Sequence, residues 1–317
     1  MQRSLGVQAV VLGSAAGGGV PQWNCRCPVC SLAWAGDPRV RPRTQSSLAV
    51  SPDGETWLLV NASPDIRQQI AATRALHPRS GLRHSPICAV LLTNGDVDHV
   101  AGLLTLRESQ SFDLLGTPEI LGAIAANRIF DVMNPAHVTR REVRLEDPFE
   151  PVEGLRATLF PVPGKAPLWL EGAAPIIGEA GESTVGVLFE AQGRRIAYVP
   201  GCARISDDLR RRVDGLDALL FDGTVLEDDD LIRAGVGTKT GWRMGHVPIN
   251  GPEGAIAGLA DCAIEQRVFV HINNTNPVLV EGSGERRAVE EAGWTVAHDG
   301  LILHLKPQAD TVAASTD

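Results

Sequence analysis

The chain has 317 residues, of which 44% are hydrophobic, enough for a globular protein with a sizeable core. Its formal net charge of −9 and the scarcity of dense Lys/Arg clusters argue against nucleic acid or an anionic membrane as a partner. It has no apolar run of about 18 residues, and its first residues lack the apolar core of a signal peptide. We therefore expect a cytoplasmic protein without a membrane segment.

A cysteine cluster follows the first predicted strand, which covers residues 7–13 and ends in a glycine-rich loop. Cys25, Cys27 and Cys30 form the pattern Cys-x-Cys-x-x-Cys. Three thiols so closely spaced can bind one soft cation, and tetrahedral zinc then needs a fourth ligand from elsewhere in the chain. We interpret the cluster as a structural zinc knuckle. The alternative is a polar loop with three loosely packed thiols.

Turn and cap patterns predict the next elements. Residues 46–50 and 56–60 alternate apolar and polar positions around Pro52-Asp53-Gly54, which indicates a hairpin. Ser63-Pro64 is typical of a helix start, with the serine as N-cap and the proline at the first helical position. Thr117-Pro118 repeats this pattern and predicts a helix that continues to about residue 128.

The most informative stretch begins with a nearly continuous apolar run over residues 87–92, which predicts a strand buried on both faces. Asn94, Asp96, Asp98 and His99 follow it, before apolar residues resume at helical spacing. The carboxyl end of a buried strand is where an α/β fold binds its ligand, and an Asp-His pair can bind a metal. The alternative is a turn whose polar residues serve only the backbone.

The second half of the chain continues with strands and helices. Strands are predicted over residues 155–163, 183–190, 196–199, 216–221 and 267–271, a helix over 254–264, and a last helix and hairpin over 285–305. Hairpins come first in each half and strand–helix alternation comes later. This order predicts two mixed sheets packed face to face with helices outside. We expect a single domain over residues 1–307 and a disordered tail over 308–317.

Polar residues at three predicted strand ends form the candidate catalytic site. Asp98, His99 and His271 supply one carboxylate and two imidazoles, a ligand set that suits a non-haem Fe(II) ion activating dioxygen. The alternative for His271 is a hydrogen-bonded histidine without a metal. Asp96 and Asp222 are interpreted as auxiliary carboxylates that orient the ligands.

The turn over residues 93–99 resembles the Thr-His-x-His-x-Asp-His turn of the metallo-β-lactamase superfamily, with both early histidines replaced. The resemblance implies an α/β fold, the four-layer αβ/βα sandwich of that superfamily. It also implies a metal histidine at His271. Asn94 and Asp96 replace the ligands of one metal, so the ligands of only the second metal remain. Lys165 stands where a further ligand is often found, and we interpret it as a cation for a substrate carboxylate or catecholate.

Residues 24–30, 162–167, 244–252 and 270–277 resemble a narrower family, the pyrroloquinoline quinone (PQQ) biosynthesis proteins B. The resemblance implies a structural Zn²⁺, an active-site Fe²⁺, and hydroxylation of the tyrosine ring of a cross-linked Glu-Tyr precursor. The expected partner is this small or dipeptide-like quinone precursor. Other pathway proteins and a second copy of the chain remain open as partners. The alternatives are a metal-dependent hydrolase and a carrier that transports PQQ or its precursor to the periplasm.

Two further residues keep more than one interpretation. His246 can act as an acid or base, orient the substrate, or serve the structure alone. Relatives with the cysteine knuckle often have His-x-x-His after the later strand, and the second histidine binds the structural zinc. This chain has His271-x-x-Asn274. Either Asn274 is the fourth zinc ligand, which we favour, or His271 binds that zinc and the active site loses a ligand.

Overall fold

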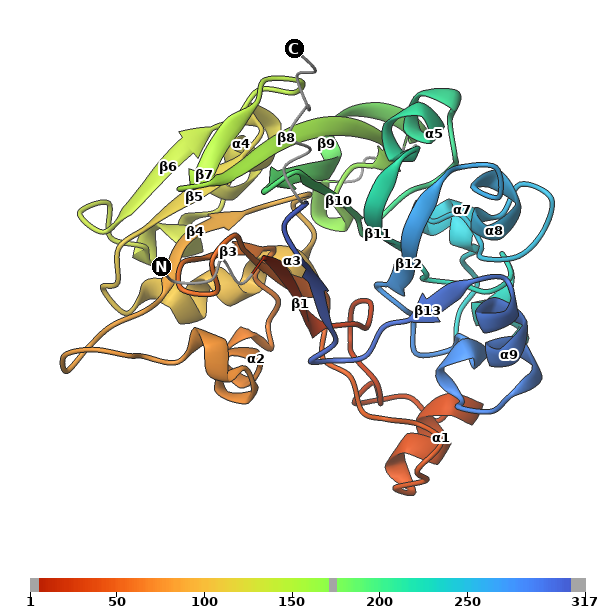
Figure 1. Cartoon of the computed structure of the whole chain (residues 1–317). Helices are drawn as coiled ribbons and strands as arrows, with labels where there is room; N and C mark the ends of the chain where they lie inside the picture. Colours follow the sequence, from red (N-terminus) through yellow and green to blue (C-terminus); the bar gives the residue numbers. More distant parts are fainter. Residues whose placement is uncertain (1–5, 171–175, 309–317) are drawn as a thin grey trace, which may run out of the picture.

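The structure is a computed structural model that describes residues 6–170 and 176–308. Two seven-stranded sheets face each other, and helices cover their outer sides (Figure 1). The predicted αβ/βα sandwich is therefore confirmed. The β2–β3 hairpin predicted around Pro52-Asp53-Gly54 is also present. Of the predicted tail, residues 309–317 lie outside the described part of the chain.

The first sheet contains both kinds of strand pairing. Its strands are, in spatial order, β14 (Ile302–Leu305), β1 (Val7–Gly13), β2 (Ser47–Ser51), β3 (Trp57–Val60), β4 (Ile87–Leu91), β5 (Phe112–Gly116) and β6 (Val138–Glu142). The pairs from β14 to β3 are antiparallel, and those from β3 to β6 are parallel. The strands of a parallel set run in the same direction. The turn after β4 therefore lies at the same edge of this sheet as the turns after β3 and β5.

The second sheet repeats this arrangement. Its strands are, in spatial order, β13 (Trp294–Val296), β12 (Ile264–Val270), β11 (Leu216–Asp222), β10 (Arg194–Val199), β9 (Ile177–Ala191), β8 (Leu155–Lys165) and β7 (Phe149–Val152). Strands β7 to β10 are antiparallel, and β10 to β13 are parallel. The turns after β11 and β12 therefore lie at the same edge of this sheet.

The helices are short. They are α1 (Pro28–Trp34), α2 (Ile66–Ala72), α3 (Val97–Val100), α4 (Pro118–Ala125), α5 (Asp207–Val213), α6 (Asp230–Arg233), α7 (Gly241–Met244), α8 (Ala255–Gly258) and α9 (Gly284–Glu291). The 3₁₀ helices are η1 (Arg74–Leu76), η2 (Ala101–Arg107), η3 (Arg128–Val132), η4 (Leu168–Leu170) and η5 (Pro277–Leu279). Thr117 caps α4 as predicted, because its Oγ1 accepts a hydrogen bond from the backbone N–H of Ile120 at 3.2 Å.

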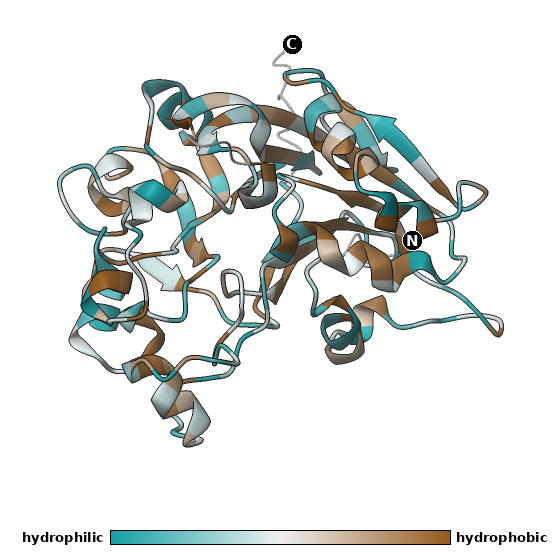
Figure 2. Cartoon of the chain, turned by 180° about the vertical axis from the view of Figure 1, so that it is seen from behind, coloured by the Kyte–Doolittle hydropathy of each residue, from teal (hydrophilic) through white to brown (hydrophobic). Residues whose placement is uncertain are grey.

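The second sheet separates two hydrophobic cores. On β11, Ala218 and Leu220 belong to the core that the two sheets share. Leu219 and Phe221 point to the opposite face, into the core that Leu209 of α5 and Val289 of α9 also join. Figure 2 shows the matching pattern, with hydrophobic residues concentrated along the strands. Because such a strand is packed on both faces, it holds the polar turn at its end in a fixed position.

Two predicted helices differ from the observed ones. Ser63 does not cap α2, which begins at Ile66 with Asp65 at its N-cap position. The Ser63 hydroxyl is buried and instead donates to Gln69 Oε1 at 3.1 Å. The helix predicted over residues 254–264 shrinks to α8, because its small residues offer little apolar surface to pack, and Ile264 already begins β12.

The predicted final hairpin is wrong. Strand β13 pairs with β12 in the second sheet, whereas β14 pairs with β1 in the first. Alternation of apolar residues identifies each strand but carries no information about its partner. The end of the chain therefore links the two sheets. The helix predicted from Thr117 to about residue 128 also ends earlier, at Ala125, before η3.

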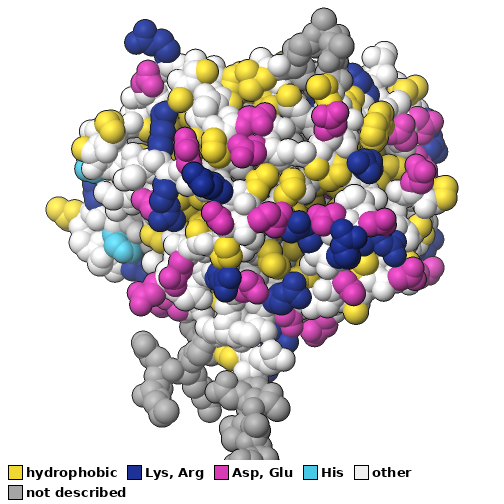
Figure 3. Space-filling model, turned by 90° about the horizontal axis from the view of Figure 1, so that it is seen from above, with side chains coloured by type: hydrophobic (Ala, Val, Ile, Leu, Met, Phe, Trp, Pro, Cys, Tyr) yellow, Lys and Arg dark blue, Asp and Glu magenta, His cyan; other side chains and the backbone are white. Residues whose placement is uncertain are grey.

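One face of the molecule carries side chains of both charges. On the face shown in Figure 3, Lys/Arg and Asp/Glu side chains are interspersed without an extended patch of one sign. Within residues 6–170 and 176–308, no helix combines the length and hydrophobicity required to span a bilayer.

Candidate metal centre

A pocket of about 250 Å³ lies where turns from both sheets meet. Six residues predicted for the site line it: Asp96, Asp98, His99, Lys165, His246 and His271. They come from the turn after β4, the end of β8, the segment after α7 and the turn after β12. The structure thus brings together side chains that lie up to 175 positions apart in the sequence, as the strand-end pattern predicted.

Asp98, His99 and His271 form the tightest polar group in this pocket. Their ligand atoms all lie within 4.8 Å of one another. Asp98 Oδ2 is 3.2 Å from His271 Nε2 and 3.9 Å from His99 Nε2. We call Asp98, His99 and His271 the facial group, because one carboxylate and two imidazoles leave further positions open on a bound ion.

Asn94 fixes the orientation of His99. Its Oδ1 accepts a hydrogen bond from the backbone N–H of Asp96 at 3.0 Å and lies 2.7 Å from His99 Nδ1. Since a carbonyl oxygen only accepts, His99 Nδ1 carries the proton and Nε2 does not. No described residue forms a hydrogen bond with the buried His99 Nε2. A buried, unpartnered nitrogen that faces a carboxylate fits a metal ion.

Asp98 and His99 have the protonation states that a bound cation requires. Burial lowers the pKa of His99 to about 4, so this imidazole is neutral near pH 7. Burial favours the neutral form of Asp98, but His99 and the hydrogen bond from His271 outweigh it and lower the pKa of Asp98. Burial likewise disfavours a charged His271, but Asp98 outweighs it and raises the pKa of His271. A metal ion would therefore bind the charged carboxylate of Asp98 and would compete with a proton for one nitrogen of His271.

Asp222 and Thr224 hold the remaining histidines. Asp222 is fully buried, and its Oδ2 accepts from the backbone N–H of Cys202 at 2.8 Å and lies 2.7 Å from His246 Nδ1. Thr224 Oγ1 donates to Asp222 Oδ1 at 2.7 Å and lies 2.9 Å from His271 Nδ1. The rings of His246 and His271 stack with centroids 5.1 Å apart. Asp222 does not line the pocket itself, but it orients His246 directly and His271 through Thr224.

The other predicted residues lie around the facial group. Asp96 lines the pocket at the N-cap position of α3, outside the groups of possible ligands found in the described residues. Lys165 is the last residue of β8 and also lines the pocket. The sequence reasoning gave no role to Asn94, Thr224 or Lys239. Asn94 had a signal, since it replaces a superfamily histidine, whereas Lys239 stands in a loop without a pattern.

The three knuckle cysteines also converge. Cys25, Cys27 and Cys30 are buried, and their sulfur atoms lie within 4.8 Å of one another. Burial raises the pKa of Cys27 to about 12, so a cation is needed to stabilise its thiolate. The backbone N–H of Cys30 points at Cys27 Sγ from 3.4 Å. The donor set fits a zinc ion with one ligand still to come from elsewhere.

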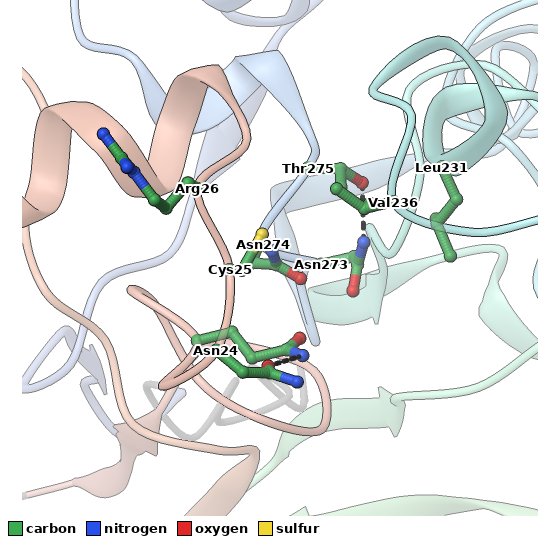
Figure 4. Close-up of a pocket in the computed structure, with 9 residues that line it drawn as sticks. Asn24, Cys25, Arg26, Leu231, Val236, Asn273, Asn274 and Thr275 are labelled. Atoms are coloured by element: carbon green, nitrogen blue, oxygen red, sulfur yellow. Dashed lines mark hydrogen bonds between the residues drawn. The ribbon is translucent and has the colours of Figure 1, made fainter.

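Asn274 occupies the fourth side of the cysteine cluster. Its Nδ2 atom lies 3.2 Å from Cys25 Sγ, 3.3 Å from Cys30 Sγ and 3.7 Å from Cys27 Sγ. A half-turn of the amide exchanges nitrogen and oxygen, so the same position offers Oδ1 to a zinc ion. Figure 4 shows Asn274 beside Cys25 in the wall of a second pocket of about 360 Å³. His271 lies with Asp98 instead, so the two candidate sites do not share it.

Comparisons with known proteins decide the family. A family model described as a β-lactamase superfamily domain matches residues 56–272. A coenzyme PQQ synthesis protein B from Methylobacterium sp. (strain 4-46) is 74% identical over 299 residues, which cover 94% of this chain and 100% of the relative. The chain belongs to the coenzyme PQQ synthesis protein B family. The resemblance inferred from the sequence motifs is thereby confirmed.

Solved structures agree with membership of the protein B family. The crystal structure of Zn²⁺-bound PqqB from Methylobacterium extorquens matches with a TM-score of 0.93 and 70% identity, covering 94% of this chain and 100% of that one. A diphosphatase of the PhnP family has a TM-score of 0.66 at 22% identity and covers 95% of this chain and 98% of its own. The diphosphatase shares the fold alone, whereas the zinc-bound relative shows that a close family member binds zinc.

The hydrogen bond between His99 Nδ1 and Asn94 Oδ1 should matter for metal binding in this member of the protein B family. Asn94→Ala should weaken metal binding at the facial group by about 10- to 100-fold, because His99 loses the acceptor that fixes its protonated nitrogen. Competition with a metal-sensitive chelator measures the affinity. Asn94→Asp keeps an acceptor and is the matched control. Equal affinity of the alanine variant and the wild type would show that Asn94 does not orient His99.

Proposed function

We propose that the chain works in PQQ synthesis as an Fe(II)- and O₂-dependent oxygenase that hydroxylates the tyrosine ring of a cross-linked Glu-Tyr precursor. The names of its relatives support the pathway. The facial group supports the reaction type, because one carboxylate and two imidazoles are typical of non-haem Fe(II) enzymes. The partners we propose are the quinone precursor and other proteins of that pathway.

The bound ion and the protein residues have separate tasks. Asp98, His99 and His271 would hold Fe(II), and the ion would supply the redox chemistry that activates dioxygen. The protein would bind and orient the substrate, and it keeps His99 and His271 buried. A zinc ion in the knuckle, bound by the three cysteines and Asn274, would stabilise the loop that carries His271. It would take no part in the reaction.

His246 would move a proton in the proposed reaction. Its Nδ1 lies 2.7 Å from Asp222 Oδ2, a carboxylate oxygen that holds the proton on Nδ1. The Nε2 atom is then the basic nitrogen of a side chain that lines the pocket. A phenol or catechol hydroxyl of the substrate bound there would give its proton to this nitrogen. The ammonium of Lys165 would stabilise the resulting anion from the end of β8.

A zinc hydrolase is the alternative. Asp222, His246 and His271 form a second group of possible ligands within 4.8 Å, and two metal ions can activate a water molecule between them. Against this alternative, Asn94 stands in place of a histidine and is engaged with His99. A carrier of PQQ or its precursor would need neither a buried carboxylate nor imidazoles held in fixed orientation.

Metal exchange separates the oxygenase from the hydrolase. The knuckle is kept loaded with zinc, and the pocket is reconstituted without oxygen with either Fe(II) or Zn²⁺. On admission of O₂ and a dihydroxyphenylalanine-like substrate, the Fe(II) protein should consume oxygen and form the hydroxylated quinone and water, and the zinc protein should do neither. The catechol itself supplies the two electrons that reduce the second oxygen atom to water. Product formation at the same rate with zinc and without oxygen uptake would refute the oxygenase.

A further inference from the structure

The lysines of this chain are concentrated at one place. Only three of its 29 basic residues are lysines. Two of them, Lys165 and Lys239, line the pocket of the facial group, and the third, Lys306, does not. Lys165 ends β8, whereas Lys239 precedes α7 some 74 positions later. Because different elements supply them, the fold and not a local run of basic residues brings the two ammonium groups to one pocket.

The segment of Lys239 is anchored at the pocket. Thr240, its neighbour, caps α7 by accepting a hydrogen bond at Oγ1 from the backbone N–H of Arg243 at 3.2 Å. Asp228 Oδ1 accepts from the backbone N–H of Trp242 at 2.7 Å. No described residue forms a hydrogen bond or ion pair with the Lys239 ammonium. Its backbone is therefore fixed while its charge remains available to a ligand.

Lys165 approaches the same wall from β8. A Cβ atom on Gly245, the C-cap of α7, would lie 3.0 Å from Lys165 Cγ. The lysine stem thus packs directly against the end of the helix that Lys239 precedes. Gly245 has a φ of 87°, which also favours glycine there. The Lys165 ammonium donates to the carbonyl oxygen of Ala166 at 3.2 Å, and the residue lines the pocket.

The charges of the lining indicate the charge of the ligand. Asp96 and Asp98 balance Lys165 and Lys239, so a divalent ion at the facial group would leave an excess of two positive charges. The whole chain carries a formal net charge of −9 and repels anions at long range. A local positive excess within such a chain favours a ligand with at least two negative charges that reaches the pocket.

We propose that Lys239 is a substrate-positioning residue that acts with Lys165 to select a substrate carrying two or more carboxylates beside the metal. Each ammonium would form a charge-assisted hydrogen bond with one carboxylate. Together they would hold the aromatic ring in the pocket beside the facial group and His246. The inference rests on the proposed function only for the identity of the substrate as a quinone precursor, because carboxylate binding itself requires no oxidation.

The test compares two ligands in the zinc-loaded protein, where no turnover occurs. The probes are PQQ, which has three carboxylates, and its trimethyl ester, which has none, and calorimetry measures both affinities. Lys239→Met and Lys165→Met should each weaken PQQ binding by about tenfold and leave ester binding unchanged. Lys306→Met is the matched control and should bind both probes like the wild type. Lys239→Arg should recover most of the PQQ affinity.

Salt dependence provides a second readout, one that a purely structural lysine would not change. The affinity for PQQ should fall with rising salt, and it should fall less steeply in Lys239→Met. Lys239→Met with wild-type affinity for PQQ, or an equal loss for PQQ and the ester, would overturn the proposal. So would wild-type protein that binds PQQ no more tightly than the ester. Failure of oxygen uptake with Fe(II) would refute the oxygenase but leave these binding results intact.

Discussion

Cys27→Ser is expected to remove about one zinc ion per chain and to lower the free energy of unfolding by about 4 kcal/mol or more. Cys27 lies between Cys25 and Cys30 in the buried cluster, and its Sγ lies 3.4 Å from the carbonyl oxygen of Asn274. The zinc would thus connect the segment after β1 to the loop after β12. A structural site with four protein ligands leaves no open position for substrate.

Metal analysis and thermal unfolding measure the Cys27→Ser effect together. Cys88→Ser is the matched control, because Cys88 is half-buried and lies outside the knuckle. Its zinc content should equal that of the wild type. If Cys27→Ser kept wild-type stability and yet lost all turnover, the knuckle would belong to the catalytic machinery and our structural assignment would be wrong.

His99→Ala, His271→Ala and Asp98→Ala should each abolish ring hydroxylation. Each removes a ligand from the facial group, so the loss should exceed the factor of about 100 that marks the upper range for groups that only orient ligands. The knuckle zinc should remain, because Asn274 and the cysteines are untouched. Metal content and turnover under anaerobic Fe(II) loading measure both effects.

Asp96→Asn is the matched control for the ligand variants. Asp96 lines the same pocket but lies outside the facial group, so its loss should lower turnover less than the removal of a ligand. If His99→Ala retained both pocket metal and turnover, His99 would not be a ligand. Asp222→Asn should fall between these cases, because Asp222 fixes the proton of His246 without lining the pocket.

Much of the site was predictable because of where its residues stand in the sequence. Asp98, His99 and His271 each follow a strand with a strong apolar pattern, and such strands end at one edge of a mixed sandwich. Asp222 follows the same rule at the end of β11. The pattern therefore predicts their convergence. It does not predict that Asp222 lies behind the pocket wall, since that depends on side-chain contacts with Cys202 and Thr224.

Other features depend on tertiary contacts that no local pattern encodes. Lys239 stands among glycines and threonines, and only the packing of α7 against Lys165 brings it to the pocket. The sequences of β13 and β14 resemble a hairpin, yet β13 pairs with β12 in the second sheet and β14 pairs with β1 in the first. Ser63 has the sequence context of an N-cap, but its hydroxyl is used by Gln69.

The origin of the oxygen atom in the product distinguishes an oxygenase from a hydrolase. Wild-type protein with Fe(II) in the pocket and zinc in the knuckle is given a dihydroxyphenylalanine-like substrate under ¹⁸O-labelled dioxygen in unlabelled water. We expect mass spectrometry to find labelled oxygen in the new ring hydroxyl, and we expect no such product from His271→Ala. Unlabelled product that forms equally well with zinc in the pocket would contradict the oxygenase assignment and favour the hydrolase.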